Sequence, residues 1–133
     1  MGFERVSVAK MEEVPPGSSR LVTVDGREVA LFNVGGRFYA IGNRCPHRSG
    51  PLVRGQIEKV SEGEEGSTTL AVRCPIHGWL FELATGRGLT RDGASTPFYP
   101  VTCEGGEICL GAAQGESVGP SKPVSIEPGG MTG

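Results

Sequence analysis

The sequence predicts an all-β fold made of short antiparallel strands. Of its 133 residues, 22 are glycine and 10 are proline, a composition that favours turns over long helices. No long stretch has the apolar spacing of an amphipathic helix, whereas short apolar runs alternate with turn signals. At this length the chain is expected to form one small domain, with little room for a second core.

The first forty residues predict an antiparallel meander. Asp25-Gly26 is a strong signal for a two-residue type I′ hairpin turn, and Gly35-Gly36 predicts a second tight turn. A loop rich in proline, glycine and serine is expected before the first of these hairpins. The strands predicted in this part comprise residues 3–8, 21–24, 28–34 and 37–41.

The rest of the domain is expected to continue as hairpins around two cysteine-bearing loops. These loops comprise residues 43–55 and 74–79. Short β-branched and aromatic runs flank them and predict strands. The predicted strands comprise residues 56–60, 69–72 and 80–83, followed by a final hairpin at residues 97–110.

The final hairpin contains two of the four cysteines. If Gly105-Gly106 is a two-residue turn, Cys103 pairs with Ile108, and Cys109 lies on the opposite face of the ladder. A disulfide between Cys103 and Cys109 is therefore not expected. Cys103 is instead expected to be a small core residue, on one apolar face with Ile108 and Leu110.

The C-terminal stretch is rich in glycine, proline and serine and has no periodicity. We expect residues 112–133 to be a flexible tail and residues 1–111 to form the domain.

Charge and hydropathy exclude several classes of partner. The net charge of −2 gives no indication of nucleic-acid binding. No apolar run approaches the ~18 residues of a membrane span, and the N-terminus has no signal-peptide pattern. The sequence therefore predicts a soluble, cytoplasmic protein without a nucleic-acid or membrane partner.

Acidic residues crowd into one stretch of the chain. Either they belong to a solvated loop, or they form a docking surface for a basic redox partner, because complementary charge speeds transient encounters. These residues are Glu58, Glu62, Glu64 and Glu65.

Both histidines of the chain stand beside a cysteine, in Cys45-Pro46-His47 and Cys74-Pro75-Ile76-His77. Ligands spaced in this way can reach one small region of space. Two thiolates on one iron and two imidazoles on the other are the ligand set of a Rieske [2Fe–2S] centre. No histidine then remains for a second iron site, a catalytic triad or a general base. The chain is therefore expected to transfer electrons and not to be an enzyme by itself.

These motifs and their flanks resemble the Rieske family. Residues 45–52 read Cys-Pro-His-Arg-Ser-Gly-Pro-Leu, and residues 74–81 read Cys-Pro-Ile-His-Gly-Trp-Leu-Phe. The resemblance covers about residues 3–110. It implies stacked antiparallel sheets with a small cluster-binding subdomain, here at about residues 43–82. It also implies that Cys45 and Cys74 hold the buried iron, and that His47 and His77 hold the outer iron.

Two features separate the chain from the respiratory members of that family. The positions that would carry their loop-bridging disulfide are Gly50 and Ile76. The positions of their serine and tyrosine hydroxyls, which donate to sulfur, are Trp79 and Phe81. Fewer donors stabilise the reduced cluster less, so we expect a reduction potential of about −150 mV, at the low end of the Rieske range.

The resemblance implies a low-potential Rieske ferredoxin with one [2Fe–2S] cluster. It would carry single electrons from a flavoprotein NAD(P)H reductase to a terminal oxygenase, such as a ring-hydroxylating dioxygenase, in transient contacts. One alternative is the small subunit of an assimilatory NAD(P)H nitrite reductase, a family that shares the fold but often loses the cluster ligands. A distant alternative is a structural zinc site in an interaction module, although the order Cys-His-Cys-His is not that of a classical zinc finger.

Overall fold

The computed structural model describes residues 5–46, 50–61, 68–76, 78–90 and 94–115. This part of the chain contains nine strands and two short 3₁₀ helices, η1 (Met11–Glu13) and η2 (Leu52–Arg54). The strands are β1 (Val6–Lys10), β2 (Ser19–Val24), β3 (Arg27–Val34), β4 (Arg37–Gly42), β5 (Gln56–Ser61), β6 (Thr68–Arg73), β7 (Leu80–Glu82), β8 (Val101–Glu104) and β9 (Glu107–Leu110). No helix in the described ranges is long and apolar enough to cross a bilayer.

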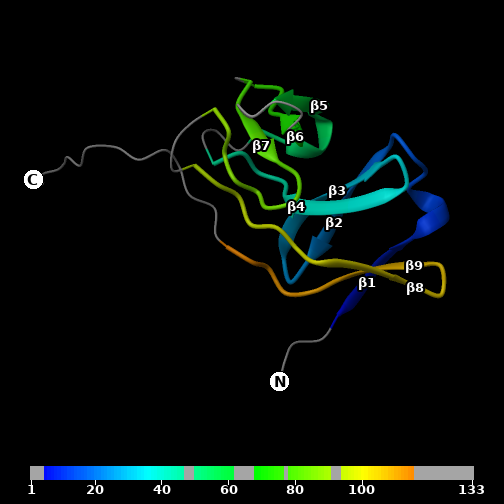
Figure 1. Cartoon of the computed structure of the whole chain (residues 1–133). Coiled ribbons are helices and arrows are strands. Elements are labelled where there is room, and N and C mark those ends of the chain that lie inside the picture. Colours follow the sequence, from blue (N-terminus) through cyan, green and yellow to red (C-terminus); the bar gives the residue numbers. More distant parts are fainter. Residues whose placement is uncertain (1–4, 47–49, 62–67, 77, 91–93, 116–133) are drawn as a thin grey trace, which may run out of the picture.

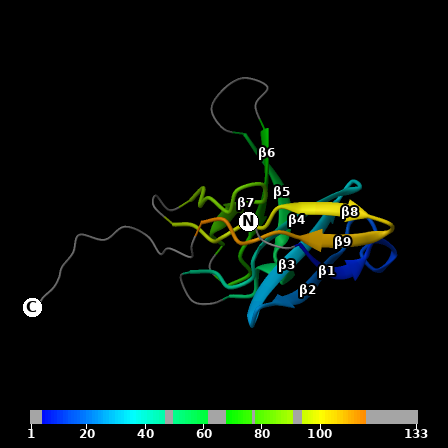
Figure 2. The ribbon, with the colours of Figure 1, turned by 90° about the horizontal axis from the view of Figure 1, so that it is seen from below.

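The strands form three antiparallel sheets of three strands each, in the orders β1-β9-β8, β2-β3-β4 and β5-β6-β7. Figure 1 shows the β2-β3-β4 sheet between the other two. Figure 2, turned by 90°, shows the β5–β6 hairpin projecting away from the rest of the molecule. The predicted all-β class and the stacked antiparallel sheets are thus confirmed.

The middle position of the β2-β3-β4 sheet follows from the apolar run in β3. Ala30 and Phe32 belong to a core cluster with residues of the β5-β6-β7 sheet. Val29 and Leu31 belong to a second cluster with residues of the β1-β9-β8 sheet. Because successive side chains of a strand point to opposite faces, a continuous apolar run can fill two cores at once.

The predicted tight turns are also confirmed. Asp25 and Gly26 both have positive φ, at 52° and 77°, as a type I′ turn requires. Gly105 and Gly106 form the corresponding turn between β8 and β9, at 57° and 81°. This turn produces the expected register, in which Cys103 pairs with Ile108.

Some strand boundaries differ from the predicted ones. The first strand covers residues 6–10, where residues 3–8 were expected, and residues 1–4 lie outside the described part. The final hairpin begins at Val101, because residues 97–100 form no regular ladder; Phe98 makes only isolated bridges, to Ile41 of β4 and to Gln114. Pro97 and Pro100 have no N–H to donate to a ladder, which shortens the strand.

The prediction that Cys103 is a core residue is wrong. Its partner Ile108 is fully buried in the central strand β9, but Cys103 itself is exposed. Cys103 lies in β8, an edge strand, two residues before Gly105 of the turn. Figure 1 shows this β8–β9 turn at one end of the molecule. The position of Cys103 in the register puts it on the apolar face, but that face is not covered there.

The expected domain boundary at residue 111 falls inside a segment that is hydrogen-bonded to the domain. Gln114 and Phe98 exchange two backbone hydrogen bonds, of 2.8 and 3.0 Å, and Gly111 donates to the carbonyl of Pro100 at 2.9 Å. The chain is therefore anchored to the domain as far as Gln114. Residues 116–133 lie outside the described residues, so the flexible tail expected there remains a prediction.

Candidate metal centre

Each cysteine of the predicted ligand set stands at the base of a closed loop. In the first loop, residues 43–55, the Cys45 N–H donates to the Gly50 carbonyl at 2.9 Å. In the second loop, residues 74–79, the Cys74 N–H donates to the Trp79 carbonyl at 2.7 Å, and the Gly78 N–H donates back to the Cys74 carbonyl at 3.0 Å. Gly78 accommodates this closure with a φ of 79°, a conformation that favours glycine.

Both cysteines are buried at the inner ends of these loops. Cys45 is 3% exposed and Cys74 is 2% exposed. Both belong to the core cluster between the β2-β3-β4 and β5-β6-β7 sheets. None of the four cysteines, all of which lie in the described ranges, forms a disulfide. Two buried thiols in an apolar setting fit the inner iron of a cluster, since thiolates are soft ligands.

Gly50 is the point at which the two loops touch. A Cβ added at Gly50 would lie 2.7 Å from Cys74 Sγ and 2.6 Å from Ile76 Cγ1, closer than packed atoms can approach. The first loop therefore passes directly over the sulfur of Cys74. This contact places Cys74, on the second loop, against the loop that begins with Cys45, so the structure brings the two predicted thiolate ligands to one region.

The contact between Gly50 and Ile76 lies where respiratory members of the family would have their loop-bridging disulfide. The Gly50 and Ile76 positions are adjacent in space, as two bridging cysteines would need to be. Neither position holds a cysteine, so at this point the two loops meet by packing, without a disulfide.

The two histidines, His47 and His77, lie outside the described residues. Their neighbours in the chain differ in exposure: Pro46 is half-buried, and Pro75 and Ile76 are exposed. Ile76 is 51% exposed, an unusual position for a large apolar side chain. The buried cysteines and the exposed residues of the second loop agree with an inner iron on sulfur and an outer iron near the surface.

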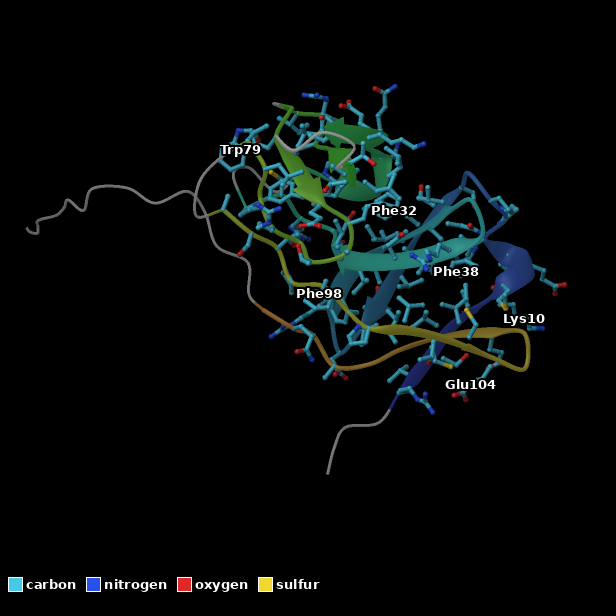
Figure 3. The ribbon with its side chains drawn as sticks, viewed as in Figure 1. Lys10, Phe32, Phe38, Trp79, Phe98 and Glu104 are labelled. Atoms are coloured by element: carbon cyan, nitrogen blue, oxygen red, sulfur yellow. The ribbon has the colours of Figure 1, made fainter. Side chains whose placement is uncertain are left out.

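The aromatic residues behave as packing residues. Trp79 is 5% exposed and Phe81 is fully buried, both in the cluster that contains the cysteines. Figure 3 shows Trp79 among the loops at the end of the molecule opposite to Glu104. Trp79 therefore packs in the core at the end of the second loop.

The sequence analysis missed Asn43, which anchors the first loop. The side chain of Asn43 is buried; its Oδ1 accepts from the Val53 N–H at 2.8 Å, and its Nδ2 donates to Glu28 Oε1 at 3.1 Å. The loop is thereby tied to β3 at its base. Buried polar groups need such partners, which explains an asparagine in a core position.

The sequence analysis also missed an ion pair beside the second loop. Arg73 Nε and Nη2 donate to the two carboxylate oxygens of Glu58, at 2.6 and 2.9 Å. These hydrogen bonds lower the pKa of the Glu58 carboxyl below its ordinary value and raise the pKa of Arg73. The Glu58 carboxylate is therefore paired with Arg73. The other glutamates of the predicted acidic surface, Glu62, Glu64 and Glu65, lie outside the described residues.

Comparison with known proteins identifies the family of the chain. The family model described as a Rieske-like [2Fe–2S] domain matches residues 4–111. The ferredoxin subunit of 3-phenylpropionate/cinnamic acid dioxygenase from Shigella flexneri is 35% identical over 111 residues, which cover 81% of this chain and 93% of that protein.

Solved structures of similar fold include the ferredoxin of carbazole 1,9a-dioxygenase from Nocardioides aromaticivorans, with a TM-score of 0.65 and 30% identity over 80% of this chain and 96% of that one. A chain from the complex of reduced oxygenase and oxidised ferredoxin in carbazole 1,9a-dioxygenase has a TM-score of 0.63 at 25% identity, over 85% and 94% of the two chains. The NADH-dependent nitrite reductase small subunit from Mycobacterium tuberculosis has a TM-score of 0.70 at 28% identity, over 84% and 96%.

Proposed function

Because this chain belongs to the family of Rieske-like [2Fe–2S] domains, we propose that it is a ferredoxin that delivers single electrons to a terminal oxygenase. Its cofactor is one [2Fe–2S] cluster, which supplies one-electron redox chemistry when bound. The observation that carries the proposal is the convergence of the two buried cysteines at Gly50. The chain also matches 93% of the length of a dioxygenase ferredoxin subunit.

The ligand set we propose consists of Cys45 and Cys74 for the inner iron, and His47 and His77 for the outer iron. The burial of both thiols and the contact between their loops support the first half of this assignment. The spacing of each histidine from its cysteine supports the second half.

A carrier role, without oxygenase chemistry in this chain, follows from the histidine count. The chain has two histidines, and both are assigned to the cluster. A separate iron site of the 2-His-1-carboxylate type would need two more. Oxygen activation therefore belongs to the partner, and this chain supplies the electron.

The proposed partners are a flavoprotein NAD(P)H reductase, which donates the electron, and a terminal oxygenase, which accepts it. The second partner is supported by the similarity to the carbazole 1,9a-dioxygenase ferredoxins, one of which is described in a complex with its oxygenase. An exposed second loop, with Pro75 and Ile76 at the surface, suits transient contacts of this kind. A cytoplasmic location is part of the same proposal.

The test is reconstitution of electron transfer. The holoprotein is purified without oxygen and mixed with a flavoprotein reductase, NADH and a ring-hydroxylating oxygenase that lacks its own ferredoxin. We expect substrate hydroxylation to depend on this chain and to be lost in the Cys74→Ser variant, which cannot hold the inner iron. Turnover at the same rate without this chain, or with Cys74→Ser, would argue against the proposal.

The nitrite reductase small subunit remains the second candidate, because a solved protein of that name has a TM-score of 0.70 to this chain. The fold alone does not separate the two functions. Retention of all four candidate ligands and 35% identity to a dioxygenase ferredoxin subunit both favour the ferredoxin. A stable complex with a nitrite reductase large subunit, in a chain that purifies without iron, would favour the alternative.

A further inference from the structure

The side chain of Arg73 folds back over the second loop. Arg73 directly precedes Cys74, and its Nη1 donates to the Gly78 carbonyl at 3.0 Å. Cys74 and Gly78 enclose the segment that carries His77. The contact therefore closes the loop from outside, in addition to the two backbone hydrogen bonds that close it from within.

Glu58 fixes the guanidinium from the neighbouring strand. In the β5–β6 register Glu58 pairs with Ala71 and Arg73 pairs with Gln56, so Glu58 and Arg73 are diagonal neighbours on one face. The Glu58 carboxylate accepts hydrogen bonds from Nε and Nη2 of Arg73, and Nη1 donates to the Gly78 carbonyl. Three different nitrogens of a planar group are thus engaged at once, and its orientation is determined.

A hydrogen bond to the Gly78 carbonyl can change the conformation of the second loop. Gly78 has a φ of 79° and no side chain, so its own conformational preferences hold the loop weakly. Because the peptide unit is planar, fixing the carbonyl of Gly78 also fixes the plane of the Gly78–Trp79 peptide. The Trp79 carbonyl at the next residue accepts the hydrogen bond from Cys74. The Arg73 contact therefore restrains the Gly78–Trp79 peptide, which lies between the two backbone hydrogen bonds that Gly78 and Trp79 make with Cys74.

We propose that Arg73, held by Glu58, is a positioning residue that sets the geometry of the second ligand loop and thereby the redox potential of the cluster. This inference rests on the proposed function, since it requires a cluster on that loop. It makes the β5–β6 hairpin part of the redox site, although no residue of β5 is a candidate ligand. We expect Arg73 to act by orienting the loop and not by its charge. The side chain of Arg73 is 42% exposed and that of Glu58 is 30% exposed, so water screens their charges.

The test compares midpoint potentials of holoprotein variants in about 1 M salt, where the Debye length is about 3 Å. The variants are Arg73→Met, Arg73→Lys, Glu58→Gln and the double variant Arg73→Met/Glu58→Gln. The matched control is Glu104→Gln, which makes the same charge change in the Arg5–Glu104 ion pair of 2.9 Å, at the opposite end of the molecule from Trp79 (Figure 3).

A positioning role predicts shifts in one direction for all three single variants, because each removes the same contact. We expect the reduced-to-oxidised ratio at a fixed potential to change at least about threefold, or about 28 mV at 59 mV per tenfold change. Lysine at position 73 is not expected to restore the wild-type potential. It has the charge of arginine but not the planar guanidinium that binds Glu58 and Gly78 at the same time. The Glu58→Gln shift is expected to vanish in the Arg73→Met background. Glu104→Gln is expected to leave the potential unchanged.

A charge role would give a different pattern. Arg73→Met and Glu58→Gln would then shift the potential in opposite directions, Arg73→Lys would resemble the wild type, and the two effects would add. That pattern, or unchanged potentials in all variants, would overturn the inference. A wild-type protein without a Rieske-type EPR signal would instead refute the proposed function.

Amide hydrogen exchange gives a second readout that does not depend on the potential. The Gly78 N–H donates to Cys74 within the loop, so its exchange reports loop closure. We expect about tenfold faster exchange in Arg73→Met and Arg73→Lys, with no change in the Glu104→Gln control. Unchanged exchange at Gly78 would show that Arg73 does not hold the loop.

Discussion

Replacing Gly50 with alanine is the sharpest steric test of the site. The added Cβ would lie 2.7 Å from Cys74 Sγ and 2.6 Å from Ile76 Cγ1. Relaxed contacts between heavy atoms need about 3.5 Å, so each is short by about 0.8–0.9 Å. The exposed Ile76 side chain can move away into solvent, whereas Cys74 is buried in the core and cannot.

The displacement falls on a proposed ligand and should therefore affect both stability and metal content. Overpacking of this kind costs about 1–3 kcal/mol, or about 4–12 °C in Tm for a chain of this length. Metal–ligand distances are expected to lie within about 0.2 Å of their standard values, which is less than this displacement. We therefore expect Gly50→Ala to retain less than half of the iron content of the wild type.

The assays are iron content per chain and thermal unfolding of the anaerobically purified protein. Gly111→Ala is the matched control, because a Cβ at Gly111 would have its shortest contact, to Pro100, at an ordinary 3.5 Å, and Gly111 is not among the residues of positive φ. Full iron loading and an unchanged Tm in Gly50→Ala would refute the inference that the first loop passes against the Cys74 sulfur.

Three further predictions test the ligands, the sulfur environment and the ion pair. His77→Cys adds a negative thiolate and should lower the potential towards the value of about −400 mV of plant-type ferredoxins; an unchanged potential in voltammetry would mean that His77 is not a ligand. Phe81→Tyr supplies a hydroxyl donor at the position where respiratory members have one, and it should raise the potential; a fall or no change would contradict the argument that missing donors keep the potential low. Because Arg73 lowers the pKa of Glu58 in the folded chain, the stabilisation by this pair is complete above the ordinary glutamate pKa of 4.5 and is lost as the pH falls below it. The Tm advantage of the wild type over Glu58→Gln should therefore shrink between pH 6 and pH 4 in thermal unfolding, and an equal advantage at both pH values would count against this linkage.

The parts of the fold that the sequence predicted are those with local causes. Asp25-Gly26 and Gly105-Gly106 determine their turns through backbone conformations that few residues adopt, and the turns then determine the register. The apolar run of β3 likewise predicts a strand without reference to distant residues. The spacing of the two cysteine–histidine motifs also predicts a ligand set, which stays a prediction because both histidines lie outside the described residues.

The parts that the sequence did not predict depend on contacts between distant segments. The exposure of Cys103 depends on which strand ends the sheet, which the hairpin register alone does not determine. The Arg73–Glu58 pair requires the β5–β6 register, and its contact with Gly78 requires the loop to return over its own base. The contact of Gly50 with Cys74 similarly joins two loops whose relative position the spacing does not reveal.

Pulsed EPR of the anaerobically purified, dithionite-reduced protein tests the central claim most directly. Coordination by Cys45, Cys74, His47 and His77 predicts a rhombic Rieske-type signal with hyperfine coupling to two histidine nitrogens. The coupling of one nitrogen should disappear in His77→Cys. A [2Fe–2S] signal without any nitrogen coupling, or a colourless protein that binds one zinc ion and gives no signal, would contradict it.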